Sequence, residues 1–393
     1  MVSRRPNPYH PGFNQPPAVL AGREGLLEDV TEALEVAAYD HRTPRPVVLV
    51  GPRGVGKTVT LGEIAELAGR QLAWPTVHVE VKPGNFLRDL VTRLTEAAQL
   101  LEGEAPLSGG PRRRARVTGG RIKAGAFGVG GEINLETVTE SQTSAEQLDL
   151  TLRHAMGVAI ARDAGVVVTL DELHTAAPAD LGVLAAVLQE HVPDDWPLVV
   201  VAAGLPSLRS NRGKRKMPTY LERAEWHDLG MLGPPDAAKA LTVPADQAGR
   251  PMTPRAATEL LGMCGGYPYA IQVAGHYAWR ASSGAETITV DHVRRARPRI
   301  EADLDQLFTS RWEDASDRER GYLRAVSEVA RSRTPTGGAV AEHLGLSTPA
   351  VSYLRERLIK KGTLYAGADG ALHFITPGMG EWLIRDQDHP QVT

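Results

Sequence analysis

The residues best suited to carry out chemistry lie between Gly51 and Thr58, a stretch that reads Gly-Pro-Arg-Gly-Val-Gly-Lys-Thr. Glycines at these spacings let successive backbone N–H groups wrap around phosphate oxygens, and a helix that begins near the lysine adds the positive end of its dipole. Lys57 then supplies a positive charge for the β- and γ-phosphates, and Thr58 supplies a hydroxyl for Mg²⁺. The stretch therefore predicts a site for a nucleotide with its magnesium ion.

The neighbouring sequence fits such a site better than a chance glycine-rich turn. The apolar run Val47–Val50 comes before the stretch and apolar residues at helical spacing come after it, so strand, loop and helix follow in the required order. We call residues 51–59 the phosphate loop. Its members expected to surround the nucleotide are Gly51, Pro52, Arg53, Gly54, Val55, Gly56, Lys57, Thr58 and Val59.

A second pair of candidate residues ends another apolar run. Residues 166–170 read Val-Val-Val-Thr-Leu, which is typical of a buried parallel strand, and Asp171 and Glu172 follow directly. Asp171 is placed to hold Mg²⁺ through its water shell, and Glu172 is placed to orient or activate the attacking water. Either carboxylate could instead cap the next helix. Together with Lys57, the pair predicts nucleotide hydrolysis.

The elements that must position these residues alternate between strand and helix. Amphipathic helical patterns separate strand-like runs at residues 47–50, 76–81, 166–170, 197–203 and 226–229. This alternation predicts an α/β domain with a parallel sheet over residues 21–233. Residues 103–141 interrupt it as a hairpin-like insertion that contains a basic cluster, which is either a solvated loop or a contact to DNA or a neighbouring subunit.

Two flanking features leave alternatives open. Residues 1–20 are rich in proline and should be extended, either disordered or packed through their aromatics on the nucleotide-binding domain near the adenine. Arg223 precedes the last strand-like run, where an arginine could reach the γ-phosphate of a neighbouring subunit in a homo-oligomer. An ordinary surface ion pair is the other interpretation of Arg223.

The C-terminal part has a different pattern. Residues 234–304 read as a small helical lid, and residues 305–386 read as three helices and a hairpin, which predicts a winged helix-turn-helix before a tail at 387–393. Its third helix could enter the major groove of double-stranded DNA, or the unit could dock a protein partner. The candidate DNA-binding residues are Thr348, Ser352, Arg355, Arg357 and Lys360.

Composition narrows the class of protein. The net charge of −3 means that any nucleic-acid binding must come from local patches, and the single cysteine, Cys264, excludes an internal disulfide and suits a reducing compartment. No apolar run is long enough to span a membrane, and residues 1–6 lack the apolar core of a signal peptide. We therefore expect a cytoplasmic protein without a membrane partner.

With these residues in view, the chain resembles prokaryotic AAA+/STAND-type P-loop ATPases, a family related to archaeal ATPases and to origin-recognition and replication-initiator ATPases. The resemblance rests on the phosphate loop, on Leu170–Leu173, on the glycine-arginine-glutamate run that begins at Gly22, and on Gly265–Tyr269. It implies a five-stranded parallel sheet, a helical lid, and hydrolysis of ATP to ADP or ATP-dependent switching. It also implies that Tyr267 and Pro268, with the Pro-rich segment, flank the adenine.

Two departures from the initiator pattern bear on mechanism. Ala203 and Gly204 occupy the end of the fourth strand, where initiators carry a polar sensor, and the run Gly265–Pro268 stands where their lid carries an arginine. A slow ATPase or a nucleotide switch follows from this. The leading hypothesis is a switch whose winged helix binds DNA; the rivals are a signalling or defence protein that self-associates with ATP and docks a protein, and a kinase.

Overall fold

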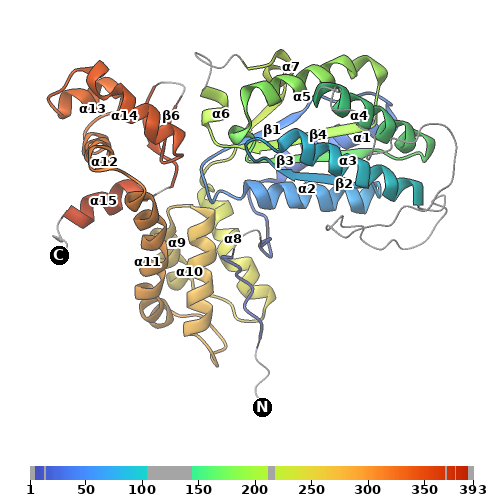
Figure 1. Cartoon of the computed structure of the whole chain (residues 1–393). Helices are drawn as coiled ribbons and strands as arrows, with labels where there is room; N and C mark the ends of the chain where they lie inside the picture. Colours follow the sequence, from blue (N-terminus) through green and yellow to red (C-terminus); the bar gives the residue numbers. More distant parts are fainter. Residues whose placement is uncertain are drawn as a thin grey trace.

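The computed structural model describes residues 5–12, 15–103, 144–210, 217–367, 370–376 and 378–387. The predicted insertion beyond Gly103 and the tail after Gln387 lie outside these residues. A five-stranded parallel sheet carries the site, in the order β2-β3-β4-β1-β5, as predicted (Figure 1). The strands are β1 (Val47–Val50), β2 (Thr76–Glu80), β3 (Val166–Asp171), β4 (Leu198–Gly204) and β5 (Glu225–Asp228).

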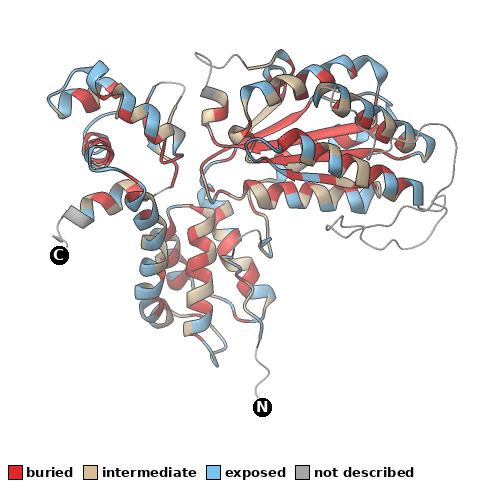
Figure 2. Ribbon diagram, viewed as in Figure 1, coloured by how far each residue is buried: buried red, intermediate tan, exposed pale blue. Residues whose placement is uncertain are grey.

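Helices cover both faces of this sheet, which explains why its central strands are apolar throughout (Figures 1 and 2). Every residue of β1, β3 and β4 is buried. The long covering helices are α1 (Glu24–Tyr39), α2 (Lys57–Gln71), α3 (Phe86–Gly103), α4 (Ser144–Ala161) and α5 (Pro178–Glu190). Short segments complete the domain: η1 (Leu173–Thr175), η2 (Val192–Asp194), α6 (Ser207–Ser210) and α7 (Thr219–Glu222).

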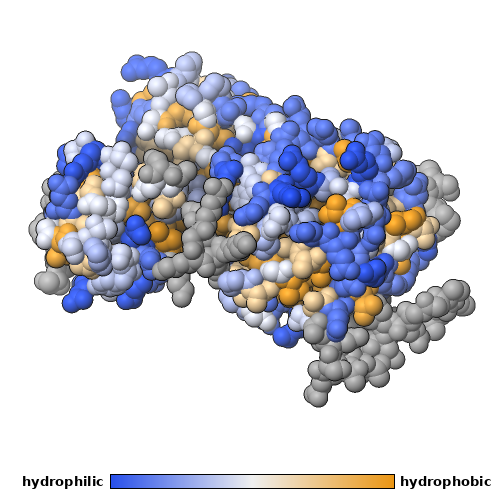
Figure 3. Space-filling model, turned by 90° about the horizontal axis from the view of Figure 1, so that it is seen from above, coloured by the Kyte–Doolittle hydropathy of each residue, from blue (hydrophilic) through white to orange (hydrophobic). Residues whose placement is uncertain are grey.

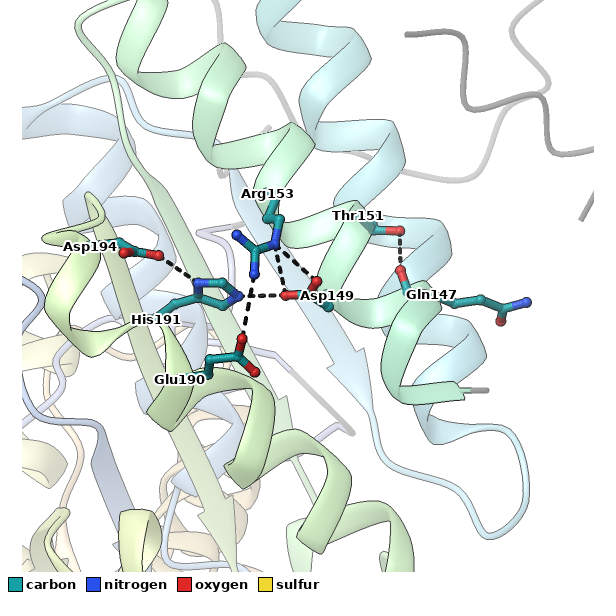
Figure 4. Close-up of polar contacts among 7 residues, drawn as sticks. All are labelled: Gln147, Asp149, Thr151, Arg153, Glu190, His191 and Asp194. Atoms are coloured by element: carbon teal, nitrogen blue, oxygen red, sulfur yellow. Dashed lines mark hydrogen bonds and ion pairs between the residues drawn. The ribbon is translucent and has the colours of Figure 1, made fainter. Parts of the chain in front are cut away.

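A buried histidine ties α4 to the end of α5 (Figure 4). His191 is 2% exposed, and its Nε2 and Nδ1 lie 2.5 Å from Asp149 and 2.6 Å from Asp194. Both ring nitrogens thus lie at hydrogen-bonding distance from a carboxylate. The ring also stacks on Trp196, with centroids 4.0 Å apart. These contacts fix α4, the first helix after the insertion, to the sheet domain.

Four helices form the lid predicted from the helical pattern after Gly233: α8 (Pro234–Gln247), α9 (Pro254–Cys264), α10 (Pro268–Ala281) and α11 (Val290–Glu313). Residues 5–12 of the N-terminal segment pack on this lid. We had expected either disorder or packing on the nucleotide-binding domain near the adenine. Tyr9 is 1% exposed and donates a hydrogen bond to the carbonyl of Leu241 in α8. Its ring fills the space beside Gly275 in α10, where a Cβ would lie 2.4 Å away.

We call the chain from residue 305 onward the C-terminal unit. The residues that follow α11 have the helix and hairpin order of a winged helix-turn-helix. They form α12 (Asp317–Ala330), α13 (Gly337–His343), α14 (Thr348–Lys360), β6 (Leu364–Ala366), β7 (Leu372–Phe374) and α15 (Met379–Gln387). The sequence pattern did not predict α15. The expected boundary between residues 304 and 305 falls inside α11, so the lid and the C-terminal unit share one continuous helix.

The described helices include none that is both long and apolar enough to cross a membrane. On the face shown in Figure 3, hydrophilic side chains predominate and the apolar ones form separate patches.

Candidate nucleotide-binding site

The phosphate loop joins the end of β1 to the first turn of α2, at the edge of the sheet where all five strands end. Its conformation requires glycine at two close approaches. A Cβ on Gly51 would lie 2.1 Å from the carbonyl oxygen of Leu229, and a Cβ on Gly54, whose φ is +75°, would lie 2.1 Å from the hydroxyl of Tyr267. A larger residue would have to displace the backbone of Leu229 at the first position and the side chain of Tyr267 at the second. The predicted residues Pro52, Val55, Gly56 and Val59 lie in the same loop and turn.

Lys57 lies inside the loop with only 6% of its surface exposed. Its ammonium group donates hydrogen bonds to the carbonyls of Gly51 at 2.9 Å and Pro52 at 2.7 Å. Burial lowers the pKa of Lys57 to about 8, although Glu172 and Asp171 act in the opposite direction. The side chain is therefore a buried donor, directed into the concave side of a loop that can bind phosphate.

The two metal-binding candidates come from a helix and a strand, and their side chains are in contact. Thr58, from α2, donates a hydrogen bond of 2.6 Å to the carboxylate of Asp171 at the end of β3. The backbone N–H of Glu172 holds the other carboxylate oxygen at 2.8 Å, so the orientation of Asp171 is fixed. A hydroxyl and a carboxylate in contact form an oxygen donor set of the kind that Mg²⁺ prefers. Thr58 and Asp171 thus fit a magnesium ion, which would polarise bound phosphate oxygens.

Glu172, the predicted base, does not cap the helical segment that follows it. Its backbone has φ +54°, a left-handed conformation that non-glycine residues adopt at a cost, and its side chain accepts no cap hydrogen bond from η1. Burial raises the pKa of its carboxyl group, while the nearby Arg53 acts to lower it. A half-buried carboxylate of raised basicity beside the phosphate loop is suited to accept a proton from water.

His174 is a site residue that the sequence interpretation missed. Its Nε2 lies 3.4 Å from a carboxylate oxygen of Glu172, and its Nδ1 accepts a hydrogen bond of 3.4 Å from the backbone N–H of Leu205, just after β4. Burial lowers the pKa of His174 to about 4, and the charges of Arg53 and Lys57 act in the same direction. The imidazole is therefore neutral at neutral pH. Its position two residues after Glu172 was the available signal.

The lid contacts the phosphate loop directly. The hydroxyl of Tyr267 donates a hydrogen bond of 3.0 Å to the carbonyl of Arg53, and the backbone N–H of Tyr269 donates one of 3.2 Å to the carbonyl of Gly54. Pro268 begins α10 between them. Arg311, near the end of α11, is half-buried in the same region, and burial, together with the charge of Arg53, lowers its pKa. Sequence reasoning also missed Arg311.

A pocket of about 390 Å³ lies beside the loop, and its size is in the range of small-molecule sites. Arg23 connects the two, since its guanidinium donates hydrogen bonds of 3.2 Å to the carbonyls of Val55 and Gly230. Tyr9 and Tyr267 do not line this pocket, and the expected contacts of Tyr267 and Pro268 with the adenine stay a prediction. Its lining residues are Gly22, Arg23, Glu24, Gly25, Leu26, His227, Asp228, Leu229 and Asp236.

The remaining candidates lie outside this cluster. Arg223 is exposed at the end of α7. Thr348 is exposed at the start of α14. Arg355 packs against Gly337, because a Cβ on Gly337 would lie 2.9 Å from the guanidinium of Arg355. Ser352 donates a hydrogen bond to the carbonyl of Pro349 within the helix. The side chain of Lys360 lies outside the described residues.

The positive charge expected at the end of α14 is partly neutralised inside the C-terminal unit. Glu319 of α12 is fully buried, and its carboxylate lies 3.1 Å from Arg357 and 2.7 Å from Lys361. The capping box predicted at Ser316 is present and uses the same carboxylate. Among the candidate DNA-binding residues, Arg357 is thus engaged inside the C-terminal unit, and binding of DNA by these residues stays a prediction.

A parallel sheet, a glycine-rich loop around a buried lysine, and a threonine in contact with a strand-end aspartate define a P-loop nucleotide-binding protein. Residues 19–201 match the family described as the AAA ATPase domain, so this part of the chain is an AAA-type ATPase domain. Residues 305–383 match a domain of unknown function, DUF8462. None of the curated proteins matches the chain in sequence.

Solved structures share the fold along nearly the whole chain. The Walker-type ATPase PABY2304 of Pyrococcus abyssi superposes with a TM-score of 0.59 at 16% identity, covering 97% of this chain and 98% of that one. The ORC2 protein of Aeropyrum pernix, solved as ADPNP and ADP complexes, gives a TM-score of 0.56 at 15% identity, with 97% and 98% covered. The chain thus shares the fold of these two proteins over nearly its whole length.

Proposed function

We propose that the protein is a slow, Mg²⁺-dependent ATPase that acts as a switch, and that the nucleotide at the phosphate loop controls a DNA-binding C-terminal unit. The 2.6 Å contact between Thr58 and Asp171 carries the proposal, because it brings the phosphate loop and the strand-end carboxylates into one site. Lys57 binds the phosphates, Thr58 and Asp171 hold the ion, and Glu172 takes the proton of the attacking water. ADPNP and ADP bound to the ORC2 protein of A. pernix support the choice of nucleotide.

The lid and the C-terminal unit are positioned to respond to the nucleotide. In the lid, Tyr267 and Tyr269 contact the phosphate loop. In the C-terminal unit, Gly362 follows Lys361 at the end of α14, and a Cβ on Gly362 would lie 3.8 Å from the guanidinium of Arg53. Phosphate groups bound at the loop would attract Arg53 and change both contacts. A change of nucleotide therefore has a physical route to the C-terminal unit.

Two variants test the ATPase assignment. Glu172→Gln should bind ATP as the wild type does and hydrolyse it at less than about a hundredth of the wild-type rate, because the amide cannot accept the proton. Asp171→Asn should lose the Mg²⁺ dependence of ATP binding. The measurements are phosphate release and nucleotide titration with and without Mg²⁺. Wild-type hydrolysis by Glu172→Gln contradicts the role of Glu172.

DNA binding is tested with labelled duplex in a salt series, in the presence of ADP or a non-hydrolysable ATP analogue. We expect nucleotide-dependent binding whose affinity falls steeply with salt, with a slope that corresponds to roughly three phosphate contacts. Absence of binding at low salt with both nucleotides contradicts the DNA assignment.

One observation favours the second candidate, a C-terminal unit that docks a protein. Leu346, just before α14, is 53% exposed, and Tyr353, on α14, is 42% exposed. Arg357 and Lys361, by contrast, bind Glu319. Apolar and aromatic side chains on such a face are typical of protein contacts. Leu346→Glu should then abolish self-association or partner binding with ATP and leave duplex binding unchanged. If DNA is the ligand, the same change weakens duplex binding.

A further inference from the structure

His174 lies between the proposed base and the end of the neighbouring strand β4. Its side chain is 14% exposed and belongs to η1, directly after Glu172 and Leu173. Gly204, at the end of β4, is its neighbour, since a Cβ there would lie 3.4 Å from the backbone nitrogen of His174. The end of β4 consists of Ala203 and Gly204 and contributes no polar side chain here. His174 therefore occupies the space between the two strands.

The hydrogen bonds of His174 fix its tautomer. The N–H of Leu205 can donate only to a nitrogen without a proton, so Nδ1 is the acceptor. Burial keeps the imidazole neutral by lowering its pKa to about 4. The single ring proton is therefore on Nε2, 3.4 Å from one carboxylate oxygen of Glu172. This donor leaves the other oxygen of Glu172 free to accept a proton from water.

The residue that orients His174 itself lies next to the C-terminal unit. Leu205 is 1% exposed, and a Cβ on Gly362 would lie 3.4 Å from its side chain. Gly362 has φ +68° and follows α14. A movement of α14 that displaced this turn would therefore act on Leu205, on His174 and on Glu172 in sequence.

We propose that His174 is a positioning residue that holds the carboxylate of Glu172 in one orientation and couples it, through Leu205, to the C-terminal unit. This inference rests on the ATPase function proposed above. His174 does not touch the nucleotide or exchange a proton with it. Its effect is on the rate of hydrolysis and not on the binding of ATP.

Two substitutions in the full-length chain separate this role from a structural one. His174→Gln retains both an N–H donor and an acceptor, and its kcat should stay within about threefold of the wild type. His174→Leu fills the same space without either, and its kcat should fall by about 10- to 100-fold, while KM and the Kd for ATP change less than about threefold. If His174→Leu does not fold, His174→Asn, which is too short to reach both partners, replaces it.

A double-mutant cycle tests the coupling. Leu205→Ala keeps its backbone N–H and removes most of the side chain that lies beside Gly362, so it should lower kcat by about 2- to 10-fold in the wild type and have no effect in His174→Leu. Independent, multiplicative effects overturn the coupling. Equal losses of kcat and ATP affinity in His174→Leu, or a normal kcat, overturn the positioning role.

The controls distinguish this inference from the proposed function. If the wild type hydrolyses ATP and Glu172→Gln does not, a normal kcat in His174→Leu contradicts His174 alone. If the wild type binds ATP and does not hydrolyse it, both the ATPase function and the role of His174 are contradicted.

Discussion

Lys57 illustrates how strongly the phosphate loop perturbs a single side chain. The ammonium group is buried and held by two carbonyls, and its pKa is lowered to about 8. An anionic phosphate nearby favours the charged form of Lys57, so binding of a nucleotide should raise the pKa that burial lowers. The affinity of the site for nucleotide should therefore depend heavily on this one charge.

Lys57→Ala should weaken ATP binding by about 3 kcal/mol, or roughly 100-fold, because it removes a buried cation from the phosphates. A titration with a fluorescent ATP analogue measures the change. Lys82→Ala is the matched control, since the side chain of Lys82 is 62% exposed beyond β2. Equal affinities for Lys57→Ala and Lys82→Ala would mean that the nucleotide does not bind at the phosphate loop.

The residues of the site differ in how far sequence predicts them. Lys57 and Thr58 belong to one local motif, and Asp171 ends an apolar strand, so their proximity follows from the geometry of a parallel sheet. His174 and Arg311 could not be assigned in this way. Their roles depend on which distant elements pack beside them, namely the end of β4 and the phosphate loop.

At the scale of elements, α12 and α14 are joined by the buried carboxylate of Glu319. Burial alone raises the pKa of Glu319, but hydrogen bonds from Lys361 and from the backbone of Ser316 outweigh it and lower the pKa to about 2. The folded pKa is below the unfolded value, so the unfolded chain takes up a proton first. The stabilisation is complete above about pH 5 and is lost as the pH falls from about 5 towards 2.

Glu319→Gln should therefore reduce the free energy of unfolding at pH 7 by about 1–2 kcal/mol, a value discounted because Arg357 and Lys361 are partly exposed. The difference from the wild type should shrink as the pH is lowered to 3.5. Urea unfolding at the two pH values measures it. Glu342→Gln, at an exposed ion pair with Arg333, is the control and should change stability little at either pH. A difference for Glu319→Gln that is independent of pH contradicts the role of its charge.

The N-terminal segment acts as part of the lid, although it is distant in sequence. Tyr9→Ala should destabilise the lid by about 3 kcal/mol, because it opens a cavity beside Gly275. Tyr9→Phe should cost about 1 kcal/mol, the hydrogen bond to Leu241 alone. Hydrogen exchange of α8 and α10 measures both. Unchanged exchange in Tyr9→Ala would show that the segment is not held on the lid in solution.

The elements themselves were largely predictable from periodicity. The alternation of strand and helix, the capping box at Ser316 and the helix-helix-hairpin order all depend on local signals and are present. The packing of residues 5–12 was not predictable, because a proline-rich segment carries no periodicity that identifies its partner. The helix α15 was missed because it has only 9 residues, which gives little more than two turns in which a helical period can be recognised.

At the scale of the whole molecule, Arg223 bears on assembly. We propose that this exposed arginine completes the site of a neighbouring subunit in a homo-oligomer. Arg223→Ala should then bind ATP normally and hydrolyse it at least about 10-fold more slowly. Mixing Arg223→Ala with Glu172→Gln should restore hydrolysis, because one subunit supplies the arginine and its neighbour the base. Exposed Arg255, changed to Ala, is the control. A mixture without recovered activity contradicts the shared site.

The helix α11 gives the molecule a mechanical property. Its 24 residues run unbroken from the lid core, where Ile300 is buried, to the core of the C-terminal unit, where Trp312 is buried. At 1.5 Å per residue it is about 36 Å long, and Arg311, near its end, lies in the region where the lid contacts the phosphate loop. A shift of the phosphate loop on nucleotide binding would therefore act on the helix that the lid and the C-terminal unit share, and would move both together.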